Sequence, residues 1–319
     1  MRISVLTPTY RRPEFLAKAL AGLDRQERPP DQIVIGTRKG DAETHSFLAG
    51  KARSDRQIEI AETAEPGVIA AMSAASLRTQ GEIVCLLDDD AEPLPDWIKR
   101  IEVHFERDPG LGFLGGRDLL QDHPAMRKAE KTTRAVGIFT PYGRILGNHH
   151  KGHGPARRVD FLKGCNAAIR GGLLRQVGFE SRLRGEGAQV HWEMALCLDV
   201  ARAGYHVTYD PAVQVIHHIA PRFGVDQSHR GGFSEDGLFD MVWNEHFVVA
   251  SRAGRLKRAS HLTWSLLVGS ADAPGALRYF PCIVRGDKFV NVRIRTALRA
   301  IREARQAARL IRVNPDEDI

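Results

Sequence analysis

Short apolar segments alternate with helical patterns through the first hundred residues, and this alternation constrains the fold more than any other feature. Residues 3–10 (ISVLTPTY), 32–36 (QIVIG) and 82–87 (EIVCLL) have the composition of buried strands. Apolar residues recur at helical spacing in the intervening segments 13–26 and 66–80. Continuous apolar strands that alternate with helices predict a mostly parallel central sheet covered by helices on both faces. The expected fold class is therefore α/β.

The chain of 319 residues is long enough for one large domain with an extension or for two modest domains. The strand–helix pattern continues to about residue 220, after which only helical patterns follow a loop-like stretch. We therefore expect an α/β domain over residues 1–220 and a helical C-terminal extension over 221–319. The last expected helix, 289–313, is amphipathic and strongly basic.

The net charge indicates which partners to expect, and the cysteines and the first residues indicate the cellular compartment. The net charge is +7 and the pI is about 9.4, which favours anionic partners such as nucleotides or phospholipid surfaces. No helix-turn-helix signal or basic–aromatic interleaving supports a nucleic-acid partner. The four cysteines form no CxxC pair, and the first residues have no long apolar signal region. We expect a cytoplasmic protein.

Three consecutive carboxylates, Asp88 to Asp90, close the apolar strand of residues 82–87 and precede two prolines. In an open α/β sheet, ligands bind beyond the carboxyl ends of the strands, where Tyr10 and Gly36 also fall. Carboxylates on a tight turn can share a hard divalent cation, which in turn can bridge the oxygens of a diphosphate. An isolated acidic turn is more often a solvated loop.

Four segments in order resemble glycosyltransferase family 2, the inverting enzymes of the GT-A fold. They are "SVLTPTYRRPEFLAKALAGL", "GVIAAMSAASLRTQGEIVCLLDDDAEPLPDWI", "FLKGCNAAIRGGLLRQVGF" and "HWEMALCLDVARAGYHVTYDPAVQVIHH", which together cover about residues 3–218. The order and spacing of the four segments carry the resemblance, because none of them is specific alone.

The resemblance implies a role for several residues. The first segment would hold the nucleoside through Pro8, Thr9, Tyr10 and Arg11. Asp88 and Asp90 would hold Mg²⁺ or Mn²⁺ with the diphosphate, and Asp89 would lie near the sugar or ribose. Gly164, Cys165 and Asn166 would line the donor and acceptor pocket. His217 would be a further metal ligand or phosphate contact.

The same resemblance places the catalytic base at Glu193, with Trp192 available to stack on an acceptor sugar. Glu186 is the second candidate for the base. The chain departs from the family pattern at two places. Many relatives have an aspartate at the end of the second strand that contacts the nucleoside base, whereas this strand ends in Gly36-Thr37 with only a later Asp41. Many relatives also have a pair of acids at the helix of the catalytic base, whereas Glu193 lacks an acidic neighbour. The first departure leaves the recognition of the nucleoside base open.

The resemblance implies transfer of a sugar from a nucleotide-diphosphate sugar to a glycan or lipid-linked acceptor, in cell-surface polysaccharide synthesis. The alternatives are a non-catalytic nucleotide-sugar binder or assembly scaffold and, third, a nucleotidyltransferase. The basic helix 289–313 could touch the cytoplasmic face of the inner membrane, but its pattern equally fits a packed helix. His149, His150 and His153 form either an inert flexible loop or a lid, and they lack the pattern of a structural zinc site.

Overall fold

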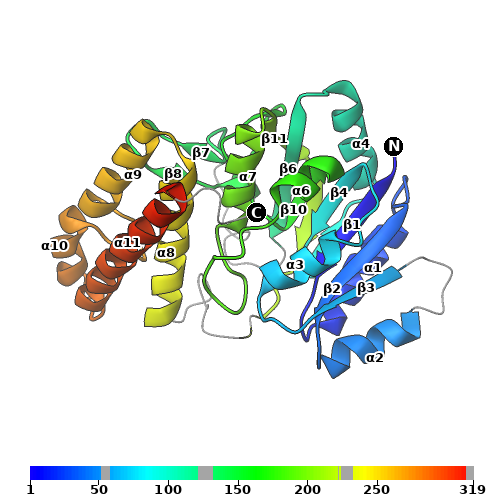
Figure 1. Ribbon diagram of the computed structural model, residues 1–319, viewed down its shortest axis with the longest axis horizontal. Helices are drawn as coiled ribbons and strands as arrows, with labels where there is room; N and C mark the ends of the chain where they lie inside the picture. The colour runs from blue at the N-terminus through cyan, green and yellow to red at the C-terminus, as the bar shows by residue number, and fades with distance from the viewer. Residues whose placement is uncertain (52–57, 121–131, 222, 224–232, 314–319) are drawn as a thin grey trace. The chain divides into compact units, whose positions relative to one another are not determined.

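The computed structural model describes residues 1–51, 58–120, 132–221, 223 and 233–313 (Figure 1). These residues divide into two compact units. The first unit comprises residues 1–138, 147–181 and 196–221, and the second comprises 139–146, 182–195 and 222–319. The second unit thus includes two segments that the predicted boundary at residue 220 assigned to the first domain.

The first unit is built on one large sheet, which confirms the predicted α/β class. Its strands run in the order β3-β2-β1-β4-β10-β6-β11-β5, with β9 also paired to β11. The strands are β1 (Ile3–Pro8), β2 (Gln32–Arg38), β3 (Ile58–Thr63), β4 (Ile83–Leu87), β5 (Ala91–Pro93), β6 (Leu111–Leu120), β9 (Arg157–Arg158), β10 (Asn166–Arg170) and β11 (His206–His217). Strands β3, β2, β1 and β4 are mutually parallel, whereas β10 is antiparallel to both of its neighbours.

The helices of the first unit cross between these strands. They are α1 (Pro13–Asp24), α2 (Ala42–Lys51), α3 (Val68–Ser76), α4 (Trp97–Arg107), α6 (Gly171–Val177) and α7 (Trp192–Arg202), the last of which begins in the second unit. Helices α1 and α2 connect strands that step outwards from β1, and α3 returns from β3 to β4. Because such crossovers are right-handed, the outward and returning helices cover opposite faces of the sheet.

The sheet forms a core because its central strands carry apolar side chains on both faces. All residues of β1 and β4 are buried, and Val5 lies opposite Cys85 in the parallel register. Trp97 and Phe105 of α4 pack into the same core at 0% and 2% exposure. Parallel pairing brings the carboxyl ends of β1, β2 and β4 to one edge, at Pro8, Gly36 and Leu87.

The second unit is mainly helical. It contains the hairpin strands β7 (Ile138–Phe139) and β8 (Ile145–Leu146) and the helices α8 (Glu235–Arg252), α9 (Arg255–Leu267), α10 (Ala276–Val284) and α11 (Val290–Val313). Ser234 caps α8 by accepting a hydrogen bond from the backbone N–H of Gly237 at 3.2 Å. Helix α11 lies along α8 (Figure 1). Among the described residues, every helix is too short or too polar to cross a bilayer.

Of the two interpretations of helix α11, a membrane-contacting helix or a packed one, its buried side fits the packed helix. The side chains of one side are buried in the second unit, where α11 packs on α8: Val290, Ala297, Ala300, Ile301, Ala304 and Ala308 are all at most 7% exposed. The amphipathic pattern of α11 therefore comes from packing within the protein. Helix α10 carries several exposed apolar side chains, and none of its side chains is buried.

Candidate active site

The acidic triplet follows β4 directly and lies in the turn before β5. Asp89 is fully buried, and its Oδ2 accepts a hydrogen bond from Thr9 Oγ1 at 2.8 Å. Arg12 lies 2.7 Å from the other oxygen of Asp89. Burial raises the pKa of Asp89 to about 7, and Arg12 limits that rise. Asp89 therefore fastens the segment after β1 to the acidic turn and is not exposed towards a ribose as predicted.

Asp90 is 4% exposed and has a different set of partners. Its Oδ2 accepts from the backbone N–H of Ala220 at 2.9 Å, and its Oδ1 lies 3.3 Å from Nε2 of His217. Burial opposes ionisation of Asp90, but the hydrogen bond and charge of His217 outweigh it and lower its pKa well below the usual range. Two of the three predicted metal ligands, Asp90 and His217, thus lie side by side.

Asp88 is the most exposed carboxylate of the triplet. Burial and the neighbouring charge of Asp90 raise its pKa to about 6. A carboxylate whose charge is disfavoured by its surroundings gains most from a cation placed beside it. Asp88 is therefore the member of the triplet best suited to accept an incoming cation.

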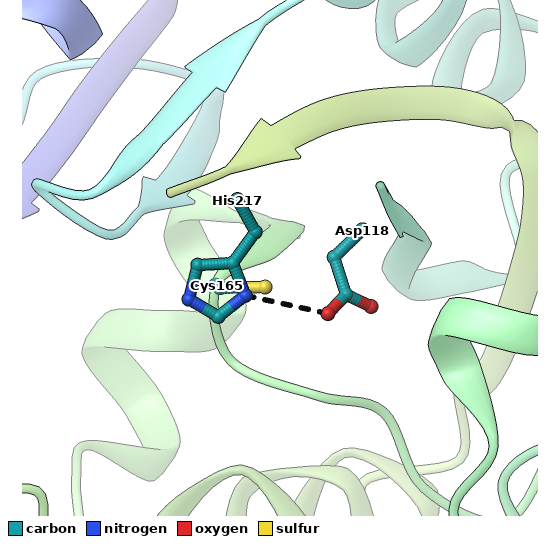
Figure 2. Close-up of side chains that lie close together, drawn as sticks. All are labelled: Asp118, Cys165 and His217. Atoms are coloured by element: carbon teal, nitrogen blue, oxygen red, sulfur yellow. Dashed lines mark hydrogen bonds and ion pairs between the residues drawn. The ribbon is translucent and has the colours of Figure 1, made fainter. Parts of the chain in front are cut away.

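His217 also belongs to a second group of donors, which Figure 2 shows. Its Nδ1 lies 3.4 Å from Oδ2 of Asp118, and the ammonium of Lys163 hydrogen-bonds to the same carboxylate. Donor atoms of Asp118, Cys165 and His217 all lie within 4.8 Å of one another. Burial opposes the charge of His217, but Asp118 and Asp90 raise its pKa to about 9. In the absence of a metal ion the imidazole is thus held as a cation between two carboxylates, and a metal ion bound at Nε2 would displace the proton there.

Asp118 was not predicted from the sequence. It lies on β6, is 1% exposed, and keeps a pKa well below the usual range because Lys163 and His217 outweigh the effect of burial. The only signal in the sequence is an aspartate within the otherwise apolar segment "LGFLGGRDLL". Together with the triplet, Asp118 gives four carboxylates that face three cations, namely Arg12, Lys163 and His217. The cluster therefore carries one negative charge when all of its groups are ionised.

The residues present fit a divalent cation at Asp88, Asp90 and His217. Asp90 Oδ1 and His217 Nε2 have the 3.3 Å separation of two atoms that ligate one ion, and Asp88 lies two residues before Asp90 in the same turn. Cys165 is a poor ligand, because burial raises the pKa of its thiol well above the ordinary value. Asp118 is already neutralised by Lys163.

The segment after β1 offers an accessible aromatic ring. Tyr10 is half-buried, and the guanidinium groups of Arg11 and Arg38 lie 5.2 and 5.8 Å from its ring centre. Arg11 has a φ of 54°, and its backbone N–H donates to Oδ2 of Asp41 at 2.7 Å. Asp41 is itself 1% exposed, so it shapes this turn and does not face a ligand. Pro8 and Thr9 are buried at the end of β1.

Close packing against α3 explains why residue 36, near the end of β2, is a glycine. A Cβ atom on Gly36 would lie 2.4 Å from the carbonyl oxygen of Ala71 in α3, which leaves no room for a side chain. The carbonyl of Gly36 accepts a hydrogen bond from the backbone N–H of Thr9 at 2.9 Å. This strand end therefore braces the segment after β1.

Asn166, which the sequence places in the donor and acceptor pocket, is occupied by contacts within the fold. It is 1% exposed, and its amide bonds to the indole of Trp97 and to the carbonyl oxygens of Arg117 and Val213. All of these partners belong to the fold of the first unit. Gly164 and Cys165 precede Asn166 and are also buried.

The predicted base, Glu193, lies in the second unit, in the first turn of α7. Its side chain is half-buried, whereas that of the alternative base, Glu186, is exposed. Trp192 is only 6% exposed and offers little surface for stacking on a sugar.

The histidine loop is ordered around its first member and is not the flexible loop expected. His149 is 4% exposed, donates from Nε2 to the carbonyl of Phe161 at 3.1 Å, and packs against the rings of Phe161 and Tyr209. It starts the short 3₁₀ helix η1 (His149–Lys151). His149 is thus a core residue, whereas His150 and His153 are half-buried.

Comparison with known proteins identifies the family. The sequence model described as "Glycosyl transferase family 2" matches residues 4–178. An uncharacterized protein of Sinorhizobium fredii, y4gI, is 25% identical over 197 residues, which are 58% of this chain and 21% of that protein. The chain therefore spans about a fifth of the length of this relative.

Two solved structures share the fold. One is the mannosyltransferase PcManGT of Pyrobaculum calidifontis, in complex with GDP-Man and Mn²⁺, with a TM-score of 0.56, 18% identity, and coverage of 99% of this chain and 88% of that one. The other is TarS 1-349 of S. aureus, in complex with UDP-GlcNAc, with a TM-score of 0.58, 12% identity, and coverage of 97% and 92%. These matches confirm the GT-A fold, and the family match over residues 4–178 favours a glycosyltransferase over a nucleotidyltransferase.

Proposed function

Because this chain belongs to glycosyltransferase family 2 and is a glycosyltransferase of the GT-A fold, we propose that it moves a sugar from a nucleotide-diphosphate sugar to a hydroxyl group of a glycan or lipid-linked acceptor. The transfer would invert the anomeric centre and serve cell-surface polysaccharide synthesis. The observation that carries the proposal is the contact of Asp90 with His217, in the turn that also holds Asp88, at the carboxyl edge of the sheet, where α/β sheets bind their ligands.

The donor would lie against the segment after β1. The half-buried ring of Tyr10 offers a face for a nucleoside base, and Arg11 and Arg38 beside it offer positive charge for phosphate oxygens. The two structural relatives bind GDP-Man and UDP-GlcNAc, which supports a nucleotide sugar as donor without fixing its base or its sugar.

Asp88, Asp90 and His217 would hold a divalent cation, and the Mn²⁺ in the mannosyltransferase relative supports this choice together with Mg²⁺. When bound, such an ion neutralises the charge of the diphosphate leaving group. Arg12 forms ion pairs with the carboxylates of Asp89 and Asp90, at nitrogen–oxygen distances of 2.7 and 3.7 Å, and so holds both side chains in place. These contacts would keep the acidic turn in one conformation before and after the donor binds.

Glu193 would act as the general base. The acceptor oxygen attacks the anomeric carbon, the bond from that carbon to the diphosphate oxygen breaks, and the acceptor proton passes to the Glu193 carboxylate. The products are the glycosylated acceptor and the nucleoside diphosphate. Glu193 is preferred to Glu186 because it lies on the first turn of a helix and is half-buried, and a fixed position favours proton transfer.

Thermal unfolding in the presence of UDP, dTDP, GDP, ADP or CMP, with and without Mn²⁺, tests the donor site. A ligand at one hundred times its dissociation constant stabilises the fold by about 2.7 kcal/mol. We expect one nucleoside diphosphate to raise the melting temperature only with Mn²⁺. Asp88→Asn should abolish this shift, and Glu106→Gln, at an exposed acid of α4, should retain it. If no nucleotide shifts the unchanged protein in either condition, the donor site is wrong.

We also propose contact with the cytoplasmic face of the inner membrane, through α10 and not through the buried side of α11. Leu277, Phe280 and Val284 of α10 are 67%, 70% and 71% exposed, and Arg285 and Lys288 beside them are exposed cations. Apolar side chains flanked by basic ones favour the surface of an anionic bilayer. Such contact would bring the enzyme to a lipid-linked acceptor.

Co-sedimentation with vesicles tests this contact. The protein should bind vesicles that contain phosphatidylglycerol and should bind phosphatidylcholine vesicles weakly. The double variant Phe280→Glu and Val284→Glu should lose binding, whereas Leu77→Glu, at an 87%-exposed leucine of the first unit, should keep it. Equal binding by both variants would exclude α10 as the contact, and a dimer that disappears in the α10 variant would assign the helix to a second copy.

A further inference from the structure

The second unit contains a compact group of potential metal ligands that the proposed reaction does not use. Donor atoms of Glu245, His246 and His261 all lie within 4.8 Å of one another. Glu245 and His246 come from α8, and His261 comes from α9. Both histidines are 3% exposed, and their ring centres are 4.7 Å apart. Two buried imidazoles that converge on a half-buried carboxylate in this way need a shared partner or a proton between them.

The orientation of His261 is fixed by a hydrogen bond on the far side of its ring. Nδ1 lies 3.0 Å from the carbonyl oxygen of Gly143, and a carbonyl can only accept, so Nδ1 carries the proton. In the neutral ring, Nε2 then has a free lone pair. This arrangement, with one ring nitrogen bound to a backbone carbonyl and the other available, is how metal-ligating histidines are usually oriented.

The free nitrogen of His261 has no hydrogen-bond partner although it is buried. Its nearest charged neighbour is Oε1 of Glu245 at 3.3 Å, but the two atoms lack the alignment of an N–H···O bond. Two ligands about 2.0–2.1 Å from a tetrahedral zinc ion are about 3.3–3.4 Å apart, and neither points directly at the other. The separation and the missing alignment therefore both match a pair of ligands to one ion.

A fourth donor approaches the same carboxylate. Nε2 of His191 lies 3.8 Å from Oε2 of Glu245. His191 has a φ of 77°, in the left-handed region that non-glycine residues rarely adopt, so the surrounding structure holds it in a strained conformation. Such strain is common at sites where a side chain is directed towards a ligand.

The hairpin between β7 and β8 packs closely against α9 beside His261. Gly143, between β7 and β8, has a φ of 95°, and a Cβ atom there would lie 2.1 Å from the carbonyl oxygen of Ser260. Only glycine lets the hairpin come near enough to α9 for its carbonyl to meet His261. The ring contact of Tyr142 with Trp264, at 5.1 Å between centres, holds the hairpin on the same helix.

We propose that Glu245, His246 and His261, with His191 as fourth ligand, bind one zinc ion that holds the second unit together. Three imidazole nitrogens and one carboxylate oxygen make a set of four ligands, which suits tetrahedral Zn²⁺. Mg²⁺ and Mn²⁺ prefer oxygen ligands. The ion would join α8, α9 and the segment 182–195 directly, and the β7–β8 hairpin through Gly143. Since Glu193 follows His191 by two residues, the ion would also position the start of α7, a consequence that rests on the proposed function.

Metal analysis of the full chain tests the site without an activity assay. Protein purified without a histidine tag should contain about one equivalent of zinc by plasma mass spectrometry. After the metal is removed with a chelator, one equivalent of Co²⁺ should produce a visible absorption band. Its intensity should be that of a cobalt ion in tetrahedral nitrogen–oxygen coordination. Zinc should also raise the melting temperature of the metal-free protein.

Matched variants locate the ion. His261→Gln and Glu245→Gln keep the size of their side chains, and each should weaken zinc binding by at least ~100-fold, beyond the usual effect of changing an outer-sphere partner. His153→Gln, at a half-buried histidine of the first unit, should bind zinc like the unchanged protein. Asp88→Asn should also retain one equivalent, which separates this site from the cation site at the strand ends.

The outcomes decide between two structures. Absence of stoichiometric zinc and of a tetrahedral cobalt spectrum in the unchanged, folded protein would overturn the proposal and leave a protonated His261 paired with Glu245. Stoichiometric zinc that persists in both glutamine variants would overturn the assigned ligands. Zinc bound as proposed by a protein that shows no nucleotide binding would contradict the proposed function only.

Discussion

Replacing Asn166 by alanine removes a buried amide that makes three hydrogen bonds. Its Oδ1 accepts from Trp97 Nε1 at 2.7 Å, and its Nδ2 donates to the carbonyl oxygens of Val213 and Arg117 at 3.0 and 3.2 Å. Trp97 is 0% exposed, so water cannot replace the lost acceptor. A buried polar group left without its partner costs about 1–3 kcal/mol, so we expect a loss of about 3–5 kcal/mol for the three bonds together.

The assay is thermal unfolding combined with calorimetric titration of the donor nucleotide. For a unit of this size, 1 kcal/mol corresponds to about 2–4 °C, so the melting temperature should fall by about 6–20 °C. Well below the transition, the dissociation constant of the nucleotide should change by less than about threefold, which corresponds to under 1 kcal/mol. A tenfold weaker donor with an unchanged melting temperature would refute this reasoning and return Asn166 to the donor pocket.

The variant Asn166→Asp adds a pH dependence that alanine lacks. Aspartate keeps an acceptor for the Trp97 indole but places a carboxylate oxygen against the carbonyls of Val213 and Arg117. Burial and these carbonyls should raise the folded-state pKa of the new carboxyl above its unfolded value of about 3.9. The variant should then lose stability as the pH rises above about 4, by up to about 1.4 kcal/mol per pH unit, until the folded-state pKa is reached. Urea unfolding between pH 4 and pH 8 measures this slope.

Three further predictions concern single side chains. Glu193→Gln should lower turnover by about 10²–10⁴-fold with unchanged nucleotide binding, and Glu186→Gln should turn over normally; equal rates in steady-state kinetics would contradict this. Burial lowers the pKa of His149 to about 4, so the fold should lose about 3 kcal/mol as the pH falls from about 6.5 to 4, because the unfolded chain takes up a proton that the folded chain excludes. His149→Gln should remove this slope from urea unfolding curves. Asp41→Ala should cost about 1–2 kcal/mol in thermal unfolding, since it removes the acceptor for the Arg11 backbone N–H.

The sheet could be predicted from the sequence because its signal is local. Strands β1, β2 and β4 are each continuous apolar segments, and any strand buried on both faces requires such a composition. The parallel order then brings Thr9 and Asp88 to one edge without further information. The acidic turn could therefore be located from the sequence before any contact was known.

Asp118 could not be identified in the same way, because its role depends on strand pairing. It lies opposite Val215 in the parallel register of β6 and β11, and this register brings it to His217, 99 residues away in the sequence. Pairing of distant strands leaves no periodic signal in either segment. The same limit explains why residues 139–146 and 182–195 could not be assigned to the second unit.

Helices α10 and α11 show where periodicity stops being informative. Helix α11 has an apolar side, and so does α10, but only a tertiary contact decides which side is covered. Helix α8 carries apolar residues such as Leu238, Val242 and Val249 that are buried in the unit it shares with α11. In the part of the chain that the structure describes, Phe280 of α10 stays 70% exposed. Amphipathic spacing therefore predicts a helix with an apolar side and does not predict the partner.

The three carboxylates of the acidic triplet have different environments, because each has its own partners. Asp89 is fixed by Thr9 and Arg12, and Asp90 by His217 and the backbone of Ala220. Both are nearly inaccessible, so changing either should damage the fold as well as any bound cation. Asp88 alone combines exposure with a charge that its surroundings disfavour. A variant of Asp88 is consequently the one that separates cation binding from stability, and Asp89→Asn and Asp90→Asn should lower the melting temperature even without any ligand.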